Sequence, residues 1–398
     1  MERQGGMGCG WEDTAPAPLR EIVQEVRSRR PAPPNLEAMR ATWAEHVATA
    51  RSEVPGLHVE AGGEILHLGE LSPGCRACKE GTWDCLFITM RCNLQCAFCC
   101  SPHETPLDYA GSAFGRTPAE IAANHARTHI TGISFSGGEP FVEAERLGEW
   151  LAWFKAHCPD RYYWVYTNGL LAGEPQLRRL AALGLDEIRF NLAASGYDHP
   201  IVLGNLEAAA GLIGRVTVEI PAIPAHADRL LASLDGWSAR GVRHLNLHEL
   251  MFEPGSPAER LAGPRREVIA DDGHRTAIDP RSRLLTLAVM RRVQEQALPL
   301  AVNDCSLQSK LRQVRGRRRS LAPLVQAPHE RLLADEVLES YCAYRSPEDY
   351  HFLHPDELVG ASRRWVGYRL MRLARTAPLA AGDPGRWLVC EAATWPLS

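Results

Sequence analysis

Two alternating periods of apolar residues run along the middle of the chain and predict strands and helices in turn. Short apolar runs are typical of buried strands, and the stretches between them have apolar residues at helical spacing. This βα repetition predicts an α/β fold with a parallel sheet. The predicted strands are 84–90, 131–136, 161–167, 186–192, 215–221 and 243–249. The predicted helices between them are 117–127, 142–156, 174–183, 203–213 and 226–239.

Weaker patterns flank this repeat on both sides. Before it, the spacing predicts two helices and a β-hairpin, and after it a long loop, a helix and a short strand. These elements are, in order, the helices 19–29 and 36–51, the hairpin 57–60 with 64–68, the loop 253–280, the helix 282–298 and the strand 300–305.

Three cysteines fall in the eight residues Cys92-Asn-Leu-Gln-Cys96-Ala-Phe-Cys99, directly after the first predicted strand. A loop with this spacing can wrap one face of a [4Fe–4S] cluster, which normally takes four thiolates. Three thiolates leave one iron without a protein ligand. An open metal position is where chemistry takes place.

A second motif, Ser136-Gly-Gly-Glu-Pro140, directly follows the second predicted strand. Together the two motifs resemble those of the radical S-adenosylmethionine (SAM) superfamily, over about residues 83–250. The resemblance implies a partial (β/α)6 TIM-type barrel at 81–300, with an N-terminal extension at 1–80 and a C-terminal extension at 301–398. It also implies that Cys92, Cys96 and Cys99 hold a [4Fe–4S] cluster. In such barrels the site gathers at the C-terminal ends of the strands.

The resemblance also implies a SAM site at these strand ends. Gly137 and Gly138 would let the backbone approach the ligand, and Glu139 would offer its carboxylate to the ammonium of SAM. Phe98 would pack beside the adenine, with a core aromatic as the alternative. For residues after later strands, turns, caps and satisfied core polar groups are the alternatives to ligand contacts. These later candidates are Thr167, Asn168, Asn191, Ser195 and His248.

A separate group of cysteines, Cys75, Cys78 and Cys85, precedes the first motif. Cys-x2-Cys is a usual metal-binding spacing, and Cys305 is our candidate for the fourth ligand. The block around Cys75 and Cys78 resembles proteins related to pyruvate formate-lyase activating enzymes. A second [4Fe–4S] cluster, mononuclear iron and zinc stay open as occupants, and free buried thiols are the alternative.

Composition and charge limit the partners and the cellular compartment that we expect. The net charge of −4 over 398 residues argues against bulk nucleic-acid binding. No apolar run approaches the roughly 18 residues that span a bilayer, and the N-terminus lacks an apolar signal core. We therefore expect a cytoplasmic protein, in which disulfides are rare. The twelve cysteines then indicate metal ligands where they cluster.

The resemblance predicts an enzyme that reductively cleaves SAM and abstracts hydrogen from a peptide or natural-product substrate. Its expected partners are this substrate and an electron donor such as flavodoxin or ferredoxin, with no nucleic acid and no membrane. The alternatives are a glycyl-radical-enzyme activase, a radical methyltransferase and a non-catalytic iron–sulfur or zinc-binding protein. The large C-terminal extension, which activases usually omit, favours the first reading, and no cobalamin motif is visible.

Overall fold

A computed structural model of the chain describes the backbone of two long regions and of several strands after them. The described residues are 36–100, 106–269, 275–325, 331–332, 337–346, 349–353, 365–373 and 388–396. The predicted helix 19–29 lies outside these residues.

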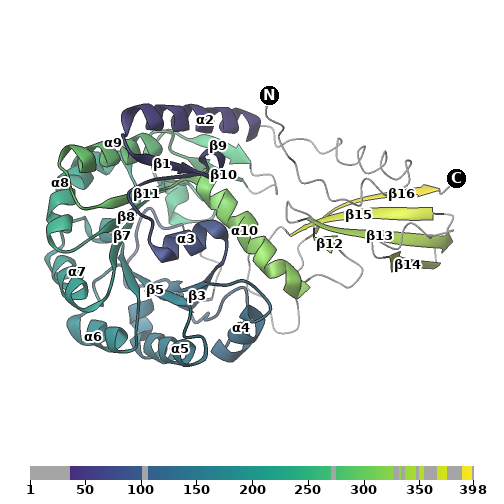
Figure 1. Ribbon diagram of the computed structural model, residues 1–398, viewed down its shortest axis with the longest axis horizontal. Coiled ribbons are helices and arrows are strands. Elements are labelled where there is room, and N and C mark those ends of the chain that lie inside the picture. The colour runs from purple at the N-terminus through teal and green to yellow at the C-terminus, as the bar shows by residue number, and fades with distance from the viewer. Residues whose placement is uncertain are drawn as a thin grey trace.

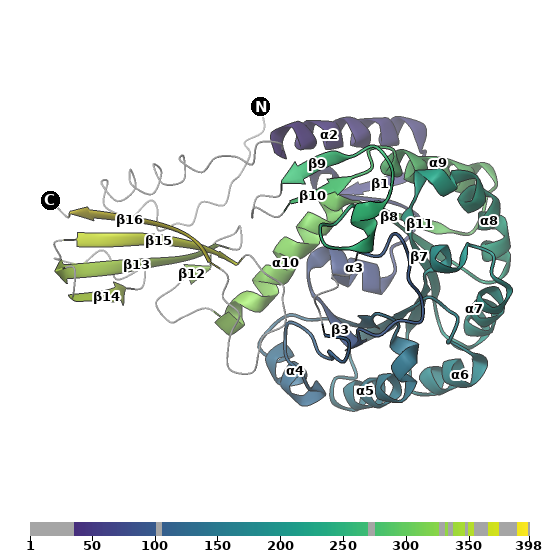
Figure 2. The same cartoon turned by 180° about the vertical axis from the view of Figure 1, so that it is seen from behind.

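One nine-stranded sheet, in the order β1-β2-β11-β8-β7-β6-β5-β4-β3, organises the fold. The six predicted strands of the repeat are β3 to β8, and they run parallel, with β11 as a further parallel strand beside β8. The sheet curls into a ring that is open between its two edge strands, β1 and β3 (Figures 1 and 2). The predicted partial barrel is thereby confirmed. The strands are β1 Leu57–Glu60, β2 Ile65–Leu68, β3 Trp83–Thr89, β4 Gly132–Gly137, β5 Tyr162–Thr167, β6 Glu187–Phe190, β7 Val216–Ala222, β8 His244–Glu249 and β11 Ala301–Cys305.

Helices lie outside the ring, one after each of the strands β3 to β7, where the apolar spacing predicted them (Figure 1). The α-helices are α2 Leu36–Glu53, α3 Pro73–Glu80, α4 Pro118–His125, α5 Ala144–His157, α6 Glu174–Ala182, α7 Pro200–Leu212, α8 Ala227–Ala239, α9 Ser282–Glu295 and α10 Leu307–Val325. Short 3-10 helices are η1 Ala61–Gly63, η2 Pro140–Glu143, η3 Leu192–Ser195, η4 Pro224–His226 and η5 Pro257–Arg260.

The predicted loop 253–280 is wrong in part, because it contains the antiparallel strands β9 Arg266–Ile269 and β10 Arg275–Ile278. Each strand has four residues and begins with an arginine, so neither makes the apolar run that predicts a strand. Val268 and Ile278 are buried in a small cluster with residues of α2 and α10. Tertiary packing therefore decides this hairpin.

Helix α3, which the sequence pattern did not predict, lies inside the ring of strands (Figure 1). Its N-cap is Ser72, whose hydroxyl accepts a hydrogen bond from Cys75 N at 3.1 Å, and Pro73 opens its first turn. It ends at Gly81, with φ at 74°. A Cβ on Gly81 would lie 2.4 Å from Gly316 Cα, so α10 crosses α3 at close range.

The two faces of the barrel strands differ in polarity. Side chains that point outward, such as Ile133, Phe135 and Val218, are fully buried in the main apolar core beneath the helices. Alternate side chains point inward and are largely polar. Arg189 and Glu187 are examples, with 2% and 0% of their surface exposed. The apolar core therefore lies between sheet and helices, and the ring encloses a polar interior.

Beyond α10 the described strands form an antiparallel sheet in the order β12-β13-β15-β16, with β14 beside β13. It lies beside α10, at the edge of the molecule (Figure 1). The strands are β12 Arg331–Leu332, β13 Val337–Ser346, β14 Asp349–Leu353, β15 Trp365–Leu373 and β16 Leu388–Pro396.

The division into the parts 1–80, 81–300 and 301–398 stays a prediction. The main sheet takes strands from all three, because β1 and β2 come from the first part and β11 from the last.

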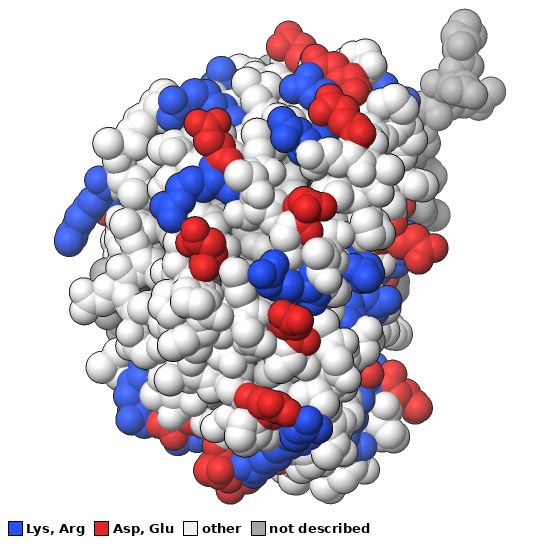
Figure 3. All heavy atoms as spheres, turned by 90° about the vertical axis from the view of Figure 1, so that its left-hand side faces the viewer, with Lys and Arg blue, Asp and Glu red and all other residues white. Residues whose placement is uncertain are grey.

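Charge is mixed over the outer helices. On the face in Figure 3, acidic and basic side chains are interspersed, and no broad patch of one sign is in view. Among the described residues, no helix combines the length and the apolar character that a membrane span requires.

Asp84, at the start of β3, makes a contribution to the stability of the fold that depends on pH. Burial would raise the pKa of Asp84, but the Arg317 guanidinium and hydrogen bonds from His125 and Ser112 hold it at about 2. A lowered carboxyl pKa stabilises the folded state above the unfolded-state pKa of 3.8, and this stabilisation is lost as the pH falls toward 2.

We therefore expect Asp84→Asn to remove about 2 kcal/mol of stability at pH 6 and about half as much at pH 3. Urea unfolding at the two pH values measures the difference. Asp235→Asn, at an exposed position of α8, is the control and should change little at either pH. An equal loss for Asp84→Asn at both pH values would contradict the prediction.

Candidate functional site

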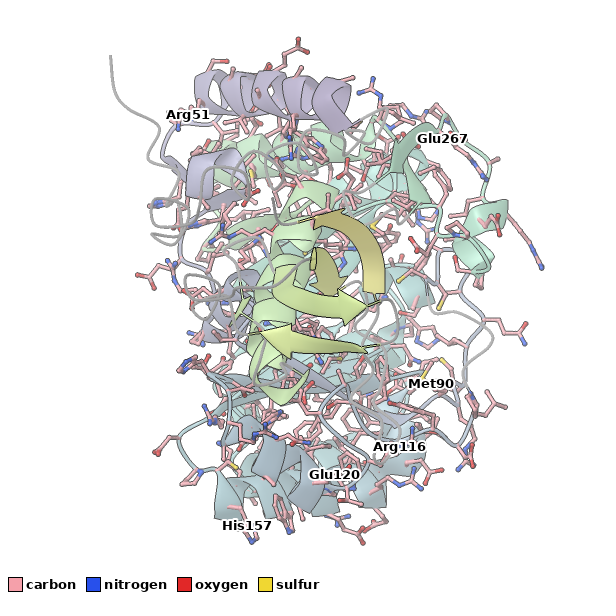
Figure 4. All side chains as sticks on the ribbon, turned by 90° about the vertical axis from the view of Figure 1, so that its right-hand side faces the viewer. Arg51, Met90, Arg116, Glu120, His157 and Glu267 are labelled. Atoms are coloured by element: carbon pink, nitrogen blue, oxygen red, sulfur yellow. The ribbon has the colours of Figure 1, made fainter. Side chains whose placement is uncertain are left out.

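The loop after β3 holds the three cysteines of the first motif. Figure 4 labels Met90, where the loop begins. Cys92 is exposed, and Cys96 and Cys99 are half-buried. Their thiols lie close enough to influence one another: burial, followed by the charges of Cys92 and Cys99, raises the pKa of Cys96 to about 11. Bound iron relieves such repulsion between thiolates, so this donor set fits an iron–sulfur cluster.

The two glycines of the second motif pack against the base of this loop. Gly137 has φ at 135°, and a Cβ on it would lie 1.9 Å from Thr89 O. A Cβ on Gly138 would lie 2.3 Å from Arg91 O. Gly138 N donates to Thr89 O at 2.8 Å, and Glu139 N donates to Arg91 O at 2.9 Å. The glycines are therefore needed because the backbone leading into the cysteine loop passes directly over them. The predicted approach of a ligand to these glycines stays a prediction.

The carboxylate of Glu139 is buried and bonded to protein donors. Its Oε1 accepts hydrogen bonds from Phe141 N at 3.1 Å and Thr167 Oγ1 at 2.9 Å, and its Oε2 accepts one from Asn168 N at 2.7 Å. Burial raises its pKa to about 6, although these three bonds act in the opposite direction. Glu139 thus joins the ends of β4 and β5, and its contact with the SAM ammonium stays a prediction.

Asn168 extends this connection to the cysteine loop. Its Nδ2 donates to Asn93 Oδ1 at 2.7 Å, and Asn93 lies between Cys92 and Cys96 in the chain. Thr167 and Asn168, two of the predicted candidates, therefore lie at the site, where Glu139 accepts hydrogen bonds from both and Asn93 accepts one from Asn168. The sequence reading missed Asn93, for which its place inside the cysteine motif was the available signal.

Other predicted residues have local partners. Phe98 packs against the cluster of Ile223, Leu250 and Phe252, so it joins the cysteine loop to the ends of β7 and β8. Asn191 caps η3 by accepting a hydrogen bond from Ala194 N at 3.3 Å, and Ser195 Oγ donates to Leu192 O at 3.4 Å. These local bonds of Asn191 and Ser195 are of the capping type that the sequence offered as the alternative to ligand contacts.

His248 belongs to a charged network inside the barrel. Its Nε2 donates to Glu219 Oε1 at 2.7 Å. Glu219 Oε2 accepts from Arg189 Nη1 and from Asn246 Nδ2, each at 2.8 Å, and Arg189 Nε donates to Glu187 Oε1 at 2.8 Å. Arg189 was not among the predicted site residues. The available signal was its charge, which is unusual in a short buried strand, Glu187-Ile-Arg-Phe190.

In the second group of cysteines, Cys78 lies close enough to Cys75 and Cys305 to feel the charges of both. Cys75 Sγ donates to Asn246 Oδ1 at 3.3 Å, Cys78 lies near Cys305, and Cys85 faces Ser134 and Ser136 on β4. Across the described residues, no three His, Cys, Asp or Glu side chains are placed to hold a single metal ion. Because this holds for Cys92, Cys96 and Cys99 as well, the second metal centre at Cys75, Cys78, Cys85 and Cys305, whether a [4Fe–4S] cluster, mononuclear iron or zinc, stays a prediction.

Replacing Glu139 tests its place in the site. In Glu139→Gln the amide NH2 would face one of three donors, so we expect the free energy of unfolding to fall by about 1–3 kcal/mol and SAM affinity to fall with it. Denaturant unfolding and calorimetric titration with SAM measure the two effects. Glu145→Gln, on an 81% exposed side chain, is the control. Unchanged stability together with weaker SAM binding would instead favour direct contact between Glu139 and the ligand.

Comparison with known proteins agrees with this geometry. Residues 73–179 match the family model described as a 4Fe-4S single cluster domain. Over 195 residues the chain is 29% identical to a Methanocaldococcus jannaschii protein to which the role of glycyl-radical enzyme activating enzyme is attributed, covering 46% of this chain and 51% of that protein. It is 30% identical over 136 residues to the PqqA peptide cyclase of Granulibacter bethesdensis, covering 34% and 33%.

Two further similarities are weaker. The GTP 3′,8-cyclase of a Synechococcus species is 28% identical over 132 residues, covering 31% of this chain and 37% of the cyclase. The crystal structure of Streptococcus suis SuiB bound to its precursor peptide SuiA has a TM-score of 0.42 at 11% identity, covering 58% of this chain and 51% of SuiB. The chain spans about half or less of the length of the curated relatives it matches. The cysteine loop, the matched cluster domain and the curated relatives together make the chain similar to the radical SAM enzymes.

Proposed function

We propose that the protein reductively cleaves SAM at a [4Fe–4S] cluster held by Cys92, Cys96 and Cys99, and that it abstracts hydrogen from a peptide or natural-product substrate. The observation that carries the proposal is the connection of the cysteine loop to the glycine motif and to Asn168. Segments from the ends of β3, β4 and β5 meet there. This is the end of a parallel barrel where active sites lie.

The chain's own residues would hold and orient the bound groups. Three thiolates would ligate the cluster and leave one iron open for SAM. When bound, such a cluster supplies the electron that breaks the C5′–S bond of SAM and so permits hydrogen abstraction from an unactivated carbon. The glycine turn fixes the first residues of the cysteine loop, and the bonds of Glu139 and Asn168 keep the neighbouring loop ends in place. Phe98 closes the loop against the ends of β7 and β8 and excludes water there.

The class of substrate is the second element of the proposal. One curated relative is a PqqA peptide cyclase, which supports a peptide substrate. The sheet β12 to β16 after the barrel adds a surface that such a substrate could contact. Activation of a glycyl-radical partner is the second candidate, favoured by the relative from Methanocaldococcus jannaschii. A flavodoxin or ferredoxin would supply the electron in either case.

The decisive experiment is anaerobic. The full chain is purified with iron and sulfide, reduced with dithionite and incubated with SAM, and 5′-deoxyadenosine and methionine are quantified by chromatography. We expect both products, together with a change in the electron paramagnetic resonance spectrum of the reduced cluster when SAM is added. A stable cluster that neither responds to SAM nor yields 5′-deoxyadenosine would refute the proposal.

The two substrate classes differ in where hydrogen originates. With a deuterated peptide library, transfer of deuterium into 5′-deoxyadenosine would support a peptide substrate. A long-lived glycyl radical signal on an added glycyl-radical protein would support activation instead. The first outcome is expected.

A further inference from the structure

The chain has only three lysines, and the fold brings two of them to the same end of the barrel. These two are Lys79 on α3 and Lys310 on α10, and the third, Lys155, lies on α5. Lys79 Nζ donates a hydrogen bond to Ser309 Oγ at 2.6 Å, and Ser309 directly precedes Lys310 in the chain. Two lysines that are far apart in the sequence therefore lie at the first turn of α10.

This turn of α10 lies at the C-terminal ends of the barrel strands. α10 begins two residues after β11 ends, and its first N–H donates to Glu249 Oε2, at the end of β8, at 2.8 Å. Lys310 Nζ donates to Met251 Sδ, two residues beyond β8, at 3.5 Å. The loop after β8 also reaches the cysteine motif, where Ala258 N donates to Cys99 O at 3.2 Å. Lys310 thus lies at the end of the barrel where the proposed radical chemistry would take place.

Neither of these two ammonium groups forms an ion pair with a carboxylate in the part of the chain that the structure describes. Lys79 is 4% exposed, and its hydrogen-bond partner is a neutral hydroxyl group. Half-buried Lys310 donates to a thioether sulfur, which is a weak acceptor. Lys155 differs, because its Nζ forms an ion pair with Asp186 Oδ2 at 3.1 Å. A buried ammonium group without an opposite charge is costly, so an anion is expected beside the first two lysines.

The acidic side chains at this end of the barrel have other partners. Glu249 accepts the hydrogen bond from the first N–H of α10. Glu219 accepts hydrogen bonds from Arg189 and His248, and Glu187 accepts one from Arg189. The positive charge of the two lysines is therefore left without a partner from these carboxylates, and a ligand could supply one.

We infer that Lys310, supported by the charge of Lys79, binds a carboxylate of the substrate where β8 and β11 end. A carboxylate supplies the opposite charge and accepts charge-assisted hydrogen bonds from an ammonium group. In a peptide this carboxylate would belong either to an acidic side chain or to the C-terminus. The inference rests on the proposed function, because it names the part of a peptide substrate that this chain recognises.

Amine labelling tests the inference without relying on SAM cleavage, because only three side chains can react. The full chain, purified anaerobically with its cluster, is acetylated with N-hydroxysuccinimidyl acetate, and peptide mass spectrometry measures the labelling of Lys310 and Lys155. The probes are N-acetylglutamate N-methylamide, its neutral counterpart N-acetylglutamine N-methylamide, and N-acetylalanine, which has a C-terminal carboxylate. We expect an acidic probe to lower the labelling of Lys310 at least about threefold, with Lys155 unchanged.

The two acidic probes distinguish the two kinds of carboxylate. Protection of Lys310 by N-acetylglutamate N-methylamide alone would indicate an acidic side chain, and protection by N-acetylalanine alone would indicate the C-terminus of a peptide. Protection by both would indicate a site for either carboxylate. Equal labelling of Lys310 with all three probes would overturn the inference. Equal protection of Lys310 and Lys155 would also overturn it, because a general salt effect would then explain the result.

Two substitutions of Lys310 separate its charge from its shape. Acidic peptides and their amidated counterparts are compared by how strongly each stimulates the formation of 5′-deoxyadenosine. We expect the preference for acidic peptides to fall at least about tenfold in Lys310→Met and to persist in Lys310→Arg. Lys155→Met is the matched control and should keep the preference of the unmodified chain. Thermal melting shows that each variant folds, and an unchanged preference in folded Lys310→Met would contradict the inference.

Failure of the inference and failure of the proposed function give different results. A chain that yields no 5′-deoxyadenosine but whose Lys310 is protected by an acidic probe would refute the proposed function and retain the carboxylate site. A chain that cleaves SAM equally well with acidic and amidated peptides would refute the inference alone. Iron content that falls in Lys310→Met but not in Lys155→Met would assign Lys310 to the predicted second metal centre and would overturn the inference.

Discussion

Replacing any one of Cys92, Cys96 and Cys99 with alanine is expected to abolish formation of 5′-deoxyadenosine. The three thiols come from one loop, and with two of them left the cluster would lose one of its ligands to iron. Iron and sulfide analysis, the visible absorption of the cluster and chromatography of 5′-deoxyadenosine measure the effect. We expect a loss of at least about a hundredfold in product for each variant.

Cys100 offers a matched control for these three positions. It directly follows Cys99, it is exposed, and it is not among the predicted ligands. Cys100→Ala should keep its cluster and most of its product. If Cys100→Ala loses the cluster while Cys99→Ala keeps it, the third ligand has been assigned to the wrong residue.

Much of the barrel was predictable because each of its elements buries an apolar surface. Strands such as β4 and β5 have outward residues in the core, and helices such as α5 cover them at helical spacing. Those patterns are local and survive in the sequence. The hairpin of β9 and β10 was not predictable, because only Val268 and Ile278 of its residues reach an apolar cluster.

Helix α3 escaped prediction for a different reason. Its eight residues are largely small or polar, and its two cysteines suggested a metal-binding turn. What holds it in place is non-local: Lys79 Nζ donates to Ser309 Oγ at 2.6 Å, and a Cβ on Gly132 would lie 3.0 Å from Ala77 Cβ. Such contacts with β4 and α10 have no sequence signature.

At the site, motifs gave the residues but not their roles. The positions of Cys92, Cys96 and Cys99 could be read from spacing alone. The tasks of Gly137 and Glu139 depend on which backbone lies against them, and only the fold places Thr89 and Asn168 there. Sequence reasoning therefore names the candidate residues, whereas the contacts that these residues make within the protein come only from the fold.

Arg189→Met is expected to lower the free energy of unfolding by about 3–5 kcal/mol. The Arg189 side chain is 2% exposed and forms ion pairs with Glu187 and Glu219, each at 2.8 Å. Its Nη2 also donates to Ser72 Oγ at 3.2 Å, the cap of α3. Methionine fills a similar volume but leaves Glu187 without its cation and Glu219 with His248 as its remaining charged partner.

The expected loss can be separated from a general effect of removing an arginine. Arg178→Met removes an exposed pair with Glu174, with side chains 63% and 55% exposed, and should cost less than about 1 kcal/mol. Urea unfolding of both variants gives the comparison. The triple variant Arg189→Met, Glu187→Gln, Glu219→Gln should recover part of the stability, because it removes the unpaired charges. If Arg189→Met lowers the free energy of unfolding no more than Arg178→Met does, the charged network inside the barrel contributes little to the stability of the fold.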